Sequence, residues 1–572
     1  MCVAYVKQDL SWEKMRDYDD IILFLGEFGR FQIAVFVLLS LSALPNGYVG
    51  MSMVFLADIP DHRCKLPLTN SSENGDQHVR LATEEYSRRV GPDMCSRYKK
   101  TNNTAASASE FGNETEGCLE GWNFSTEKYT STIVSEWVLV CDNAWKVPFS
   151  TSIFFLGVLI GSFISGHLSD RFGRKPVFFS TMAFQTIITL IQSTSINWPM
   201  FCVLNCLRGV GQISNYISSL VLGSEILGKS TRGSYTLLGH SVAFGVGYAC
   251  LPLFAYFIRG WRMLLVASAI PCVFFIPLWW VIPESPRWLL SQGRVEEAEL
   301  VIKNAAKMNR VPAPEVIFRA DECTELTPRS RGEVQQVCSF LDLFQTADMR
   351  NITIVSLILW TATCMIFYGL SLNTANMSGD SYLNCFISAT TEIVAYVGTW
   401  LLINHAQRPT ILFSSLLFCG IMLLVIRLVP DDQIVLSQVL ALLGKLGVSG
   451  AYSFLYLFST ELFPTVVRNM GLGVASMAAR VGSILSPYVL YIGVYNKILP
   501  YIIFGIISLF SAGLSLLLPD TRGCKLPENI SQVKPIRRLC SSKELSTEQC
   551  DHDLEEFPKL ENRSNCTRLP NT

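Results

Sequence analysis

Long apolar runs are the feature of this sequence that most constrains its fold. A transmembrane helix needs about 20 mostly apolar residues to cross a hydrocarbon core about 30 Å thick. Half of the 572 residues are apolar and only 16% are charged, whereas soluble domains carry about 25% charged residues. We therefore predict an all-α membrane protein with twelve transmembrane helices, at residues 31–57, 147–168, 176–195, 199–222, 235–257, 262–283, 352–373, 382–403, 409–428, 434–457, 471–494 and 498–518.

Lysines and arginines in the short loops predict the orientation of the chain. Cytoplasmic loops of membrane proteins carry an excess of Lys and Arg. The loop after the second span holds Arg171, Arg174 and Lys175, whereas loops 196–198 and 374–381 hold neither residue type. We therefore expect a multi-pass protein of the plasma membrane with both termini in the cytoplasm.

This orientation divides the chain into segments around two groups of six spans. The amphipathic stretch 295–308, between the two groups, predicts a cytoplasmic helix at the membrane face. The expected segments are a cytoplasmic N-terminus (1–30), a first six-helix half (31–283) with a large extracellular loop (58–146), a cytoplasmic central loop (284–351), a second six-helix half (352–518) and a cytoplasmic tail (519–572).

The large loop after the first span has the features of a secreted segment. It holds four N-x-S/T sequons and four cysteines, which predict glycosylation and two disulfides in an oxidising compartment. Four cysteines allow three pairings, and the sequence does not choose between them. No CxxC pair occurs, so a zinc site has no support, and we predict no metal site. The residues are Asn70, Asn102, Asn113 and Asn123, and Cys64, Cys95, Cys118 and Cys141.

A repeated motif relates the two halves. Glu225 precedes Arg232 by seven residues after the fourth span, and Glu461 precedes Arg468 by seven after the tenth. A fainter echo links residues 171–176 with 407–409. Two matched halves suit alternating access, in which one half moves against the other around a site at the membrane midplane. We expect salt bridges of a cytoplasmic gate, which hold the outward-facing state and break on closure outside, among Asp170, Arg171, Arg174, Glu225, Arg232, Glu461 and Arg468.

Several long strings resemble a known transporter family. Residues 166–175 (GHLSDRFGRK) resemble the loop signature of the major facilitator superfamily, and 283–289 (PESPRWL) the mid-loop signature of its organic-ion and sugar branches. The large glycosylated loop narrows the resemblance to the organic cation/anion/zwitterion transporters. The sequence most resembles the organic cation/carnitine (OCTN) branch, and this resemblance runs from about Met15 to Gly523. The strings that carry it are 18–21 (YDDI), 164–175 (ISGHLSDRFGRK), 211–216 (GQISNY), 224–229 (SEILGK), 251–259 (LPLFAYFIR) and 482–487 (GSILSP).

Polar and charged residues inside the spans are the candidates for substrate binding, because ionisable groups at membrane depth are expensive and usually functional. Arg480 lies in the middle of the eleventh span, with Ser483 on the same helical face. The guanidinium is a fitting anchor for a carboxylate; a structural ion pair is the alternative. By resemblance, carnitine- and anion-handling relatives carry Arg at this position and cation-selective relatives carry Asp.

A second polar stripe lies in the fourth span. Arg208, Gln212 and Asn215 are spaced i, i+4 and i+7, so they share one helical face, and Tyr216 adjoins them. These side chains could form a wall of the substrate cavity or hydrogen-bond to neighbouring helices, and the sequence leaves both interpretations open. The resemblance covers Gln212, Asn215 and Tyr216, whereas the carnitine branch has an apolar residue where this chain has Arg208.

Aromatic side chains are candidates for holding a quaternary ammonium group by cation–π contacts, and packing is the alternative. By resemblance, spans 1, 4, 7 and 10 line the cavity. The candidates in spans 7 and 10 are Trp360, Phe367, Tyr368, Tyr452 and Tyr456. For an ion-binding or coupling role the candidates are Asn46 beside Pro45, Arg208, Glu392 and Lys445.

These features predict a secondary active transporter of a small organic cation or zwitterion, carnitine-like by resemblance, with sodium as a candidate co-transported ion. We expect no enzyme and no cofactor, since no ATP-binding Gly-x4-Gly-Lys-Ser/Thr motif and no nucleophile constellation occur. Membrane lipid is the expected surrounding. A nucleic-acid partner is not expected, because 46 Lys+Arg balance 47 Asp+Glu. A sodium-independent organic anion exchanger and a non-transporting receptor or scaffold are the alternatives, the latter disfavoured by the repeat.

Overall fold

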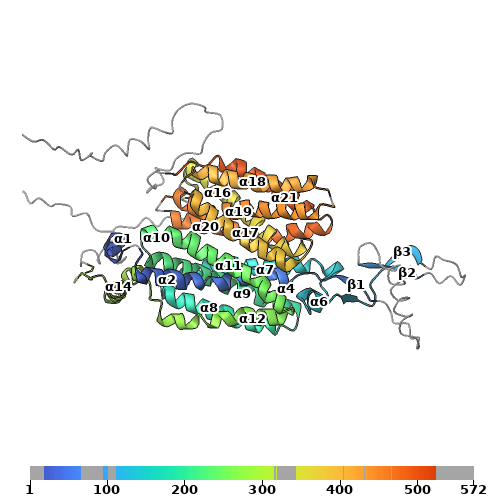
Figure 1. Ribbon diagram of the computed structural model, residues 1–572, viewed down its shortest axis with the longest axis horizontal. Helices are drawn as coiled ribbons and strands as arrows, with labels where there is room; N and C mark the ends of the chain where they lie inside the picture. The colour runs from blue at the N-terminus through green and yellow to red at the C-terminus, as the bar shows by residue number, and fades with distance from the viewer. Residues whose placement is uncertain are drawn as a thin grey trace, which may run out of the picture.

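The computed structural model describes residues 18–26, 28–65, 95–100, 111–314, 317–318, 343–403, 405–430, 432–464 and 467–522. Helices lying side by side in two groups dominate it (Figure 1). The first half contains α2 (Arg30–Leu41), α3 (Leu44–Met51), α4 (Met53–Leu56), α7 (Lys146–Phe172), α8 (Arg174–Ser193), α9 (Trp198–Ile226), α10 (Lys229–Ser234), η3 (Tyr235–His240), α11 (Ser241–Phe257), α12 (Trp261–Val273) and η4 (Ile276–Trp280). The second contains α16 (Ala347–Leu372), η6 (Asn373–Asn376), α17 (Ser381–Leu402), α18 (Arg408–Val425), η7 (Ile426–Leu428), α19 (Ile434–Leu462), α20 (Arg468–Tyr491), η8 (Ile492–Val494) and α21 (Leu499–Ser515).

Each of the twelve predicted spans falls on helix within the described residues. Nine helical segments there are long and apolar enough to cross a membrane. Of the remaining three, α21 has only 17 residues, while α8 and α9 carry polar side chains such as Gln185 and Asn205. These polar side chains are buried inside the protein, so a span can be less apolar where it faces other helices instead of lipid.

Close helix packing holds each half together. The main contacts of the first half are those of α9 with α7 and α8, and in the second half α16 packs on α20 and α18 on α19 and α21. Two glycines let α7 and α9 approach: a Cβ at Gly157 would lie 1.9 Å from the Cys206 carbonyl oxygen, and one at Gly209 2.3 Å from that of Phe154. Small residues allow this backbone contact between membrane helices.

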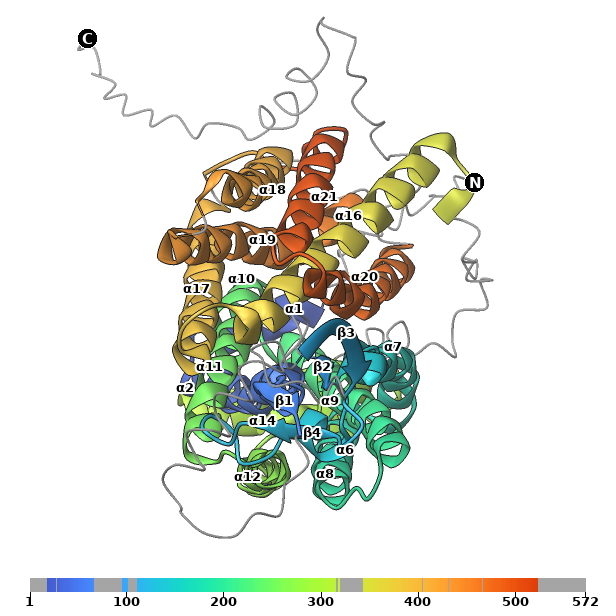
Figure 2. The same ribbon diagram turned by 90° about the vertical axis from the view of Figure 1, so that its right-hand side faces the viewer.

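The two halves meet along two seams, α7 against α20 and α11 against α17. The seams pair the second span with the eleventh and the fifth with the eighth, so the halves are joined in the same way on both sides (Figure 2). The first span is broken into α2, α3 and α4 at Ser42–Ala43 and Ser52, and Pro45 lies in the first turn of α3.

Short segments cover the two ends of the bundle. At one end, α1 (Tyr18–Ile21), η1 (Ile22–Leu25), α13 (Pro286–Ser291) and α14 (Val295–Asn309) pack together. At the other end lies a cap, which we define as described residues 59–145, with β1 (His62–Cys64), β2 (Ser96–Lys100), β3 (Phe111–Gly117), β4 (Trp122–Phe124), α6 (Ile133–Trp137) and η2 (Cys141–Asn143) (Figure 1). Strand β1 pairs antiparallel with β4, and β2 with β3.

Two disulfides fasten the cap. Cys64 is joined to Cys118, and Cys95 to Cys141, which is one of the three pairings that the sequence left open. Of the four sequons, Asn123 lies exposed on β4 and Asn113 lies on β3. Asn70 and Asn102 lie outside the described residues.

The cap also links the two halves through a small polar cluster. Lys128 Nζ lies 2.6 Å from Asp58 Oδ2 at the end of the first span and donates to Ser381 Oγ of the second half, also at 2.6 Å. The Tyr382 hydroxyl donates to the Lys128 carbonyl at 3.1 Å, and the Tyr129 hydroxyl to Asp58 at 2.6 Å. The halves are therefore held together at the cap end in this conformation.

Replacement of Lys128 by Met is expected to lower the free energy of unfolding by about 1–3 kcal/mol, the usual cost of leaving a buried polar group unpaired. Asp58, with its side chain 6% exposed, would keep the Tyr129 hydroxyl and the Ile59 backbone N–H as donors but would lose its cationic partner. The measurement is thermal unfolding of the purified protein in detergent, with Lys65→Met, at an exposed position of the cap, as the matched control. Equal stability of the Lys128→Met and Lys65→Met variants would contradict this role. Adding Asp58→Asn to Lys128→Met should recover most of the lost stability, because the unpaired carboxylate is then removed.

Candidate substrate-binding site

Arg480 lies halfway along α20, with only 4% of the residue exposed. The phenols of Tyr456, Tyr368 and Tyr452 and the thiol of Cys364 lie within electrostatic range of its charge. Among the described residues no carboxylate pairs with this guanidinium, and its Nε has no hydrogen-bond partner. A structural ion pair, the alternative reading of the sequence, is therefore not found for Arg480 in that part of the chain.

Aromatic rings from α16 and α19 form a cluster beside Arg480. The rings of Phe367 and Tyr452 are stacked with centroids 4.7 Å apart, and Trp360 meets Tyr456 edge-on at 4.5 Å. Trp360 and Phe367 are each 1% exposed, whereas Tyr368, Tyr452 and Tyr456 are partly exposed. The tyrosines thus form the accessible surface of the cluster, and the two fully buried rings pack behind them.

Tyr216 brings the first half to this cluster. Its phenol lies within electrostatic range of Tyr456, Tyr368 and Arg480, and its ring rests on His240 with centroids 4.3 Å apart. A side chain of α9 therefore faces side chains of α16, α19 and α20, so the candidate site is shared by both halves.

The other polar residues of the fourth span hydrogen-bond between helices. Asn46 Nδ2 donates to Asn215 Oδ1 at 3.0 Å, and Gln212 Nε2 to the Asn46 carbonyl at 3.3 Å. Asn215 Nδ2 donates to the Phe178 carbonyl at 3.0 Å. Asn215 and Gln212 thus fasten α9 to α3 and α8, while Asn46 Oδ1 is a buried acceptor without a partner among the described residues.

Ser483 forms a hydrogen bond within its own helix. It is fully buried, and its hydroxyl donates to the Ala479 carbonyl of its own helix at 3.1 Å. A helical serine commonly makes this bond to the preceding turn, which leaves its only proton unavailable to a substrate.

Three further charged side chains are buried in the spans. Arg208 is fully buried; its Nη2 donates to Ser52 Oγ at 2.9 Å, and its Nε and Nη1 have no partner in the described chain. Lys445 Nζ lies 3.5 Å from Glu392 Oε2 and 2.6 Å from Ser388 Oγ. Lys445 and Glu392 therefore neutralise each other. Arg208 and Arg480 have no acidic partner in the described chain, so these four buried charges include two uncompensated positive ones.

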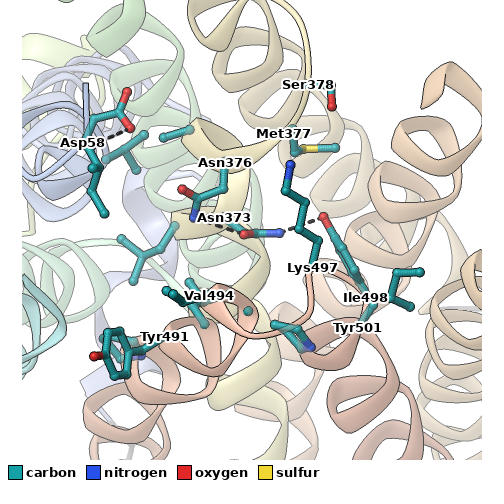
Figure 3. A pocket seen from close by; sticks show the side chains of 18 of the residues that line it. Asp58, Asn373, Asn376, Met377, Ser378, Tyr491, Val494, Lys497, Ile498 and Tyr501 are labelled. Carbon is teal, nitrogen blue, oxygen red and sulfur yellow. Dashed lines mark hydrogen bonds between the residues drawn. The ribbon is translucent and has the colours of Figure 1, made fainter. Parts of the chain in front are cut away.

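A cavity of about 460 Å³ lies away from this cluster, at the cap end between the halves (Figure 3). None of the predicted substrate-binding residues lines it.

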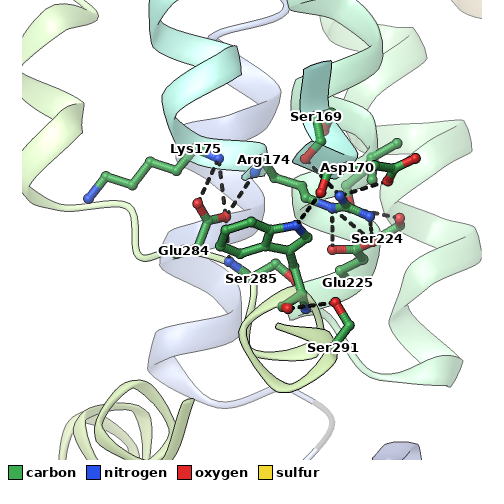
Figure 4. A network of polar contacts seen from close by, with 11 residues as sticks. Ser169, Asp170, Arg174, Lys175, Ser224, Glu225, Glu284, Ser285 and Ser291 are labelled. Atoms are coloured by element: carbon green, nitrogen blue, oxygen red, sulfur yellow. Dashed lines mark hydrogen bonds and ion pairs between the residues drawn. The ribbon is translucent and has the colours of Figure 1, made fainter. Parts of the chain in front are cut away.

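At the end opposite the cap, matching salt bridges occur in the two halves. Arg174 contacts Glu225 through two nitrogens, at 2.9 and 3.0 Å, and Asp170 at 2.8 Å (Figure 4). Arg408 contacts Glu461 through Nε at 3.0 Å and Nη2 at 3.1 Å. Each bridge joins neighbouring helices of one half, α8 with α9 or α18 with α19.

These bridges differ from the expected gate in two respects. First, both salt bridges are intact while the halves are held together at the cap end. Closure at the cap end is therefore not accompanied by breaking of these bridges in this structure. The partner of Glu461 is Arg408, which the sequence marked only as a faint echo. Arg232 donates to the Ser224 carbonyl at 2.7 Å, and Arg468 donates to the Phe463 carbonyl at 3.2 Å. Arg171 is exposed beside Phe172.

The mid-loop signature completes the bridge of the first half. Glu284 accepts from the backbone N–H groups of Arg174 and Lys175, both at 3.1 Å, and the Trp288 indole donates to the Asp170 carbonyl at 2.9 Å (Figure 4). Burial raises the pKa of the Glu284 carboxyl above its ordinary value, although these backbone donors act in the opposite direction. Residues 283–289 thus fasten the central segment to the start of α8.

Comparisons with known proteins agree with this architecture. The sugar (and other) transporter family matches residues 98–528. Solute carrier family 22 member 4 of Mus musculus is 47% identical over 96% of this chain and 99% of its own. Organic cation/carnitine transporter 2 of Homo sapiens is 47% identical with the same coverage. The E. coli xylose transporter XylE, solved in a partially occluded inward open conformation, superposes with a TM-score of 0.56 over 87% of this chain at 16% identity, which shows the fold alone.

Double-mutant cycles test whether the salt bridges act within each half. Arg408→Ala and Glu461→Ala should be coupled by about 1–3 kcal/mol in the free energy of unfolding, as should Arg174→Ala and Glu225→Ala, because each pair is in contact. Arg174→Ala and Glu461→Ala, taken from different halves, should add to within about 0.5 kcal/mol. Coupling across the halves as large as that within them would contradict the pairing.

Proposed function

We propose that this chain carries a small zwitterion with a carboxylate and a quaternary ammonium group. It belongs to the sugar (and other) transporter family and, within that family, to the organic cation/carnitine transporters. The substrate would be carnitine-like. It would cross the plasma membrane by alternating access, with the cap outside and both termini in the cytoplasm. The protein is a membrane transporter and not an enzyme.

The observation that carries the proposal is the buried guanidinium of Arg480 without an acidic partner. A buried charge is costly unless it is paired, and a guanidinium fork matches a carboxylate with two parallel hydrogen bonds. A substrate carboxylate would supply the missing anion. Binding of a carboxylated molecule is therefore favoured over binding of a simple cation, which Arg480 would repel.

The tyrosines beside Arg480 support the other half of the substrate. The faces of aromatic rings attract quaternary ammonium groups within about 6 Å of the ring centre, and Tyr368, Tyr452 and Tyr456 are the partly exposed rings of the cluster. Tyr216 faces them from the first half. A zwitterion held between Arg480 and these rings would contact both halves, which is what alternating access requires.

Sodium is proposed as the co-transported ion. Asn46 Oδ1 is a buried acceptor without a partner among the described residues, at the point where the first span is broken. Broken spans offer oxygen ligands to sodium in other transporters. Glu392 and Lys445 neutralise each other, which favours a structural role for that pair.

A second candidate is an organic anion exchanger of the same fold, favoured by one observation: Arg208 is a further buried cation without an acid in the described chain. The Arg208 guanidinium lies over the Phe154 ring, 5.3 Å from its centroid, and donates to Ser52 Oγ. The two candidates differ in whether transport needs sodium.

Replacement of Arg480 by Gln tests the carboxylate anchor. Loss of a charge-assisted pair is expected to raise the KM for carnitine by about tenfold or more, since about 1.4 kcal/mol corresponds to tenfold. Arg480→Lys should be intermediate, because it keeps the charge and loses the fork. The measurement is radiolabelled carnitine uptake in cells with surface expression matched to wild type. Unchanged carnitine uptake by Arg480→Gln would contradict the anchor.

Carnitine uptake measured with sodium replaced by N-methylglucamine tests whether sodium is co-transported. The same measurement on Asn46→Ala tests whether Asn46 binds the sodium ion. A fall in wild-type uptake without sodium is expected, together with a weaker sodium dependence in Asn46→Ala. Full uptake of a dicarboxylate without sodium would instead support the anion exchanger.

A further inference from the structure

The cavity at the cap end forms a second site, separate from the Arg480 cluster. It has a volume of about 460 Å³, within the range of about 300–1,000 Å³ usual for small-molecule pockets. Its walls come from both halves: Val54 and Val147 belong to the first, Leu372 and Ile434 to the second. Most of the lining is apolar, as in pockets that hold a ligand with an apolar body.

The polar groups of this cavity favour an anion. Asp58 is the one carboxylate in the lining, and it already binds Lys128 Nζ and the Tyr129 hydroxyl at 2.6 Å each. Lys497 is exposed on the opposite wall, and no acidic side chain of the described residues pairs with it. The cavity therefore has an unneutralised ammonium group and no free carboxylate.

Tyr501 adds a donor close to Lys497 in the chain. Its hydroxyl accepts from Asn373 Nδ2 at 2.7 Å, and Asn376 Nδ2 in turn donates to Asn373 Oδ1 at 3.2 Å (Figure 3). No acceptor for the proton of the Tyr501 hydroxyl occurs among the described residues, so this proton is available to a ligand. A carboxylate can accept from an ammonium and from a hydroxyl at the same time.

We propose that this cavity binds a soluble amphipathic carboxylate, a molecule with one carboxylate and an apolar chain. Lys497 and Tyr501 would hold the carboxylate, and the apolar walls would hold the chain. Since both halves form the walls, separation of the halves at the cap end would disrupt the site. A ligand that binds one conformation better than another shifts the population toward it, so an occupant would stabilise the conformation joined at the cap end.

For uptake, this predicts inhibition that raises the apparent KM for external carnitine, because an occupant would lower the share of molecules whose halves are apart at the cap end. The inference rests on the proposed function only in placing the cavity outside the cell. Binding to the purified full-length protein does not depend on transport, so failure of the site and failure of the proposed function are distinguishable.

Equilibrium dialysis of radiolabelled octanoate against the purified protein in detergent tests the site directly. Lys497→Gln should weaken octanoate binding by about tenfold, the effect of one charge-assisted contact, and Lys497→Arg should restore it. Lys65→Gln, at an exposed position of the cap, is the matched control, and 1-octanol is the matched uncharged probe. Arg480→Gln should leave octanoate binding unchanged.

Equal octanoate binding by Lys497→Gln and Lys65→Gln would overturn the proposal. Loss of octanoate binding in Arg480→Gln would also overturn it, because the probe would then occupy the central cluster. Equally tight binding of 1-octanol would show an apolar pocket without anion recognition, and would refute the role given to Lys497 and Tyr501.

Discussion

A guanidinium group in the middle of a membrane-spanning bundle needs an opposite charge, and the structure around Arg480 depends on that need. The side chain is 4% exposed and has no acidic partner in the described chain. The phenols of Tyr368 on α16 and of Tyr452 and Tyr456 on α19 lie within electrostatic range of it but carry no charge. Arg480 thus has no anion among the described residues, and the tyrosine rings of the cluster are partly exposed. In the proposed complex the substrate carboxylate would pair with Arg480, and its ammonium group would lie against the tyrosine rings.

The contrast with the other buried charges shows what is structural. Lys445 and Glu392 neutralise each other at 3.5 Å, and the ring of Tyr248 from the first half covers Lys445 at 4.7 Å. The bridges Arg174–Glu225 and Arg408–Glu461 are equally complete. Each joins two neighbouring helices of one half at the end opposite the cap. The contacts of Lys128 with Ser381 and Tyr382 join the halves at the cap end, so movement of one half against the other would have to break them.

Local sequence predicted the spans and the polar face of α9, because apolar length and an i, i+4, i+7 spacing are properties of one helix. The disulfide pairing and the partner of Glu461 depend on contacts between distant segments. The motif around Arg408 is eroded to three residues, so the repeat did not mark its role. Ser483 shares a helical face with Arg480, but spacing does not show that its hydroxyl bonds to its own helix. Likewise, sequence did not separate the buried Trp360 and Phe367 from the accessible tyrosines.

The most direct test of the account is a cryo-electron microscopy structure of the protein with carnitine bound. We expect the carboxylate oxygens at about 2.7–2.9 Å from the guanidinium nitrogens of Arg480, and the trimethylammonium group against the rings of Tyr368, Tyr452 or Tyr456. A carboxylate bound to Arg208, with Arg480 still unpaired, would contradict it.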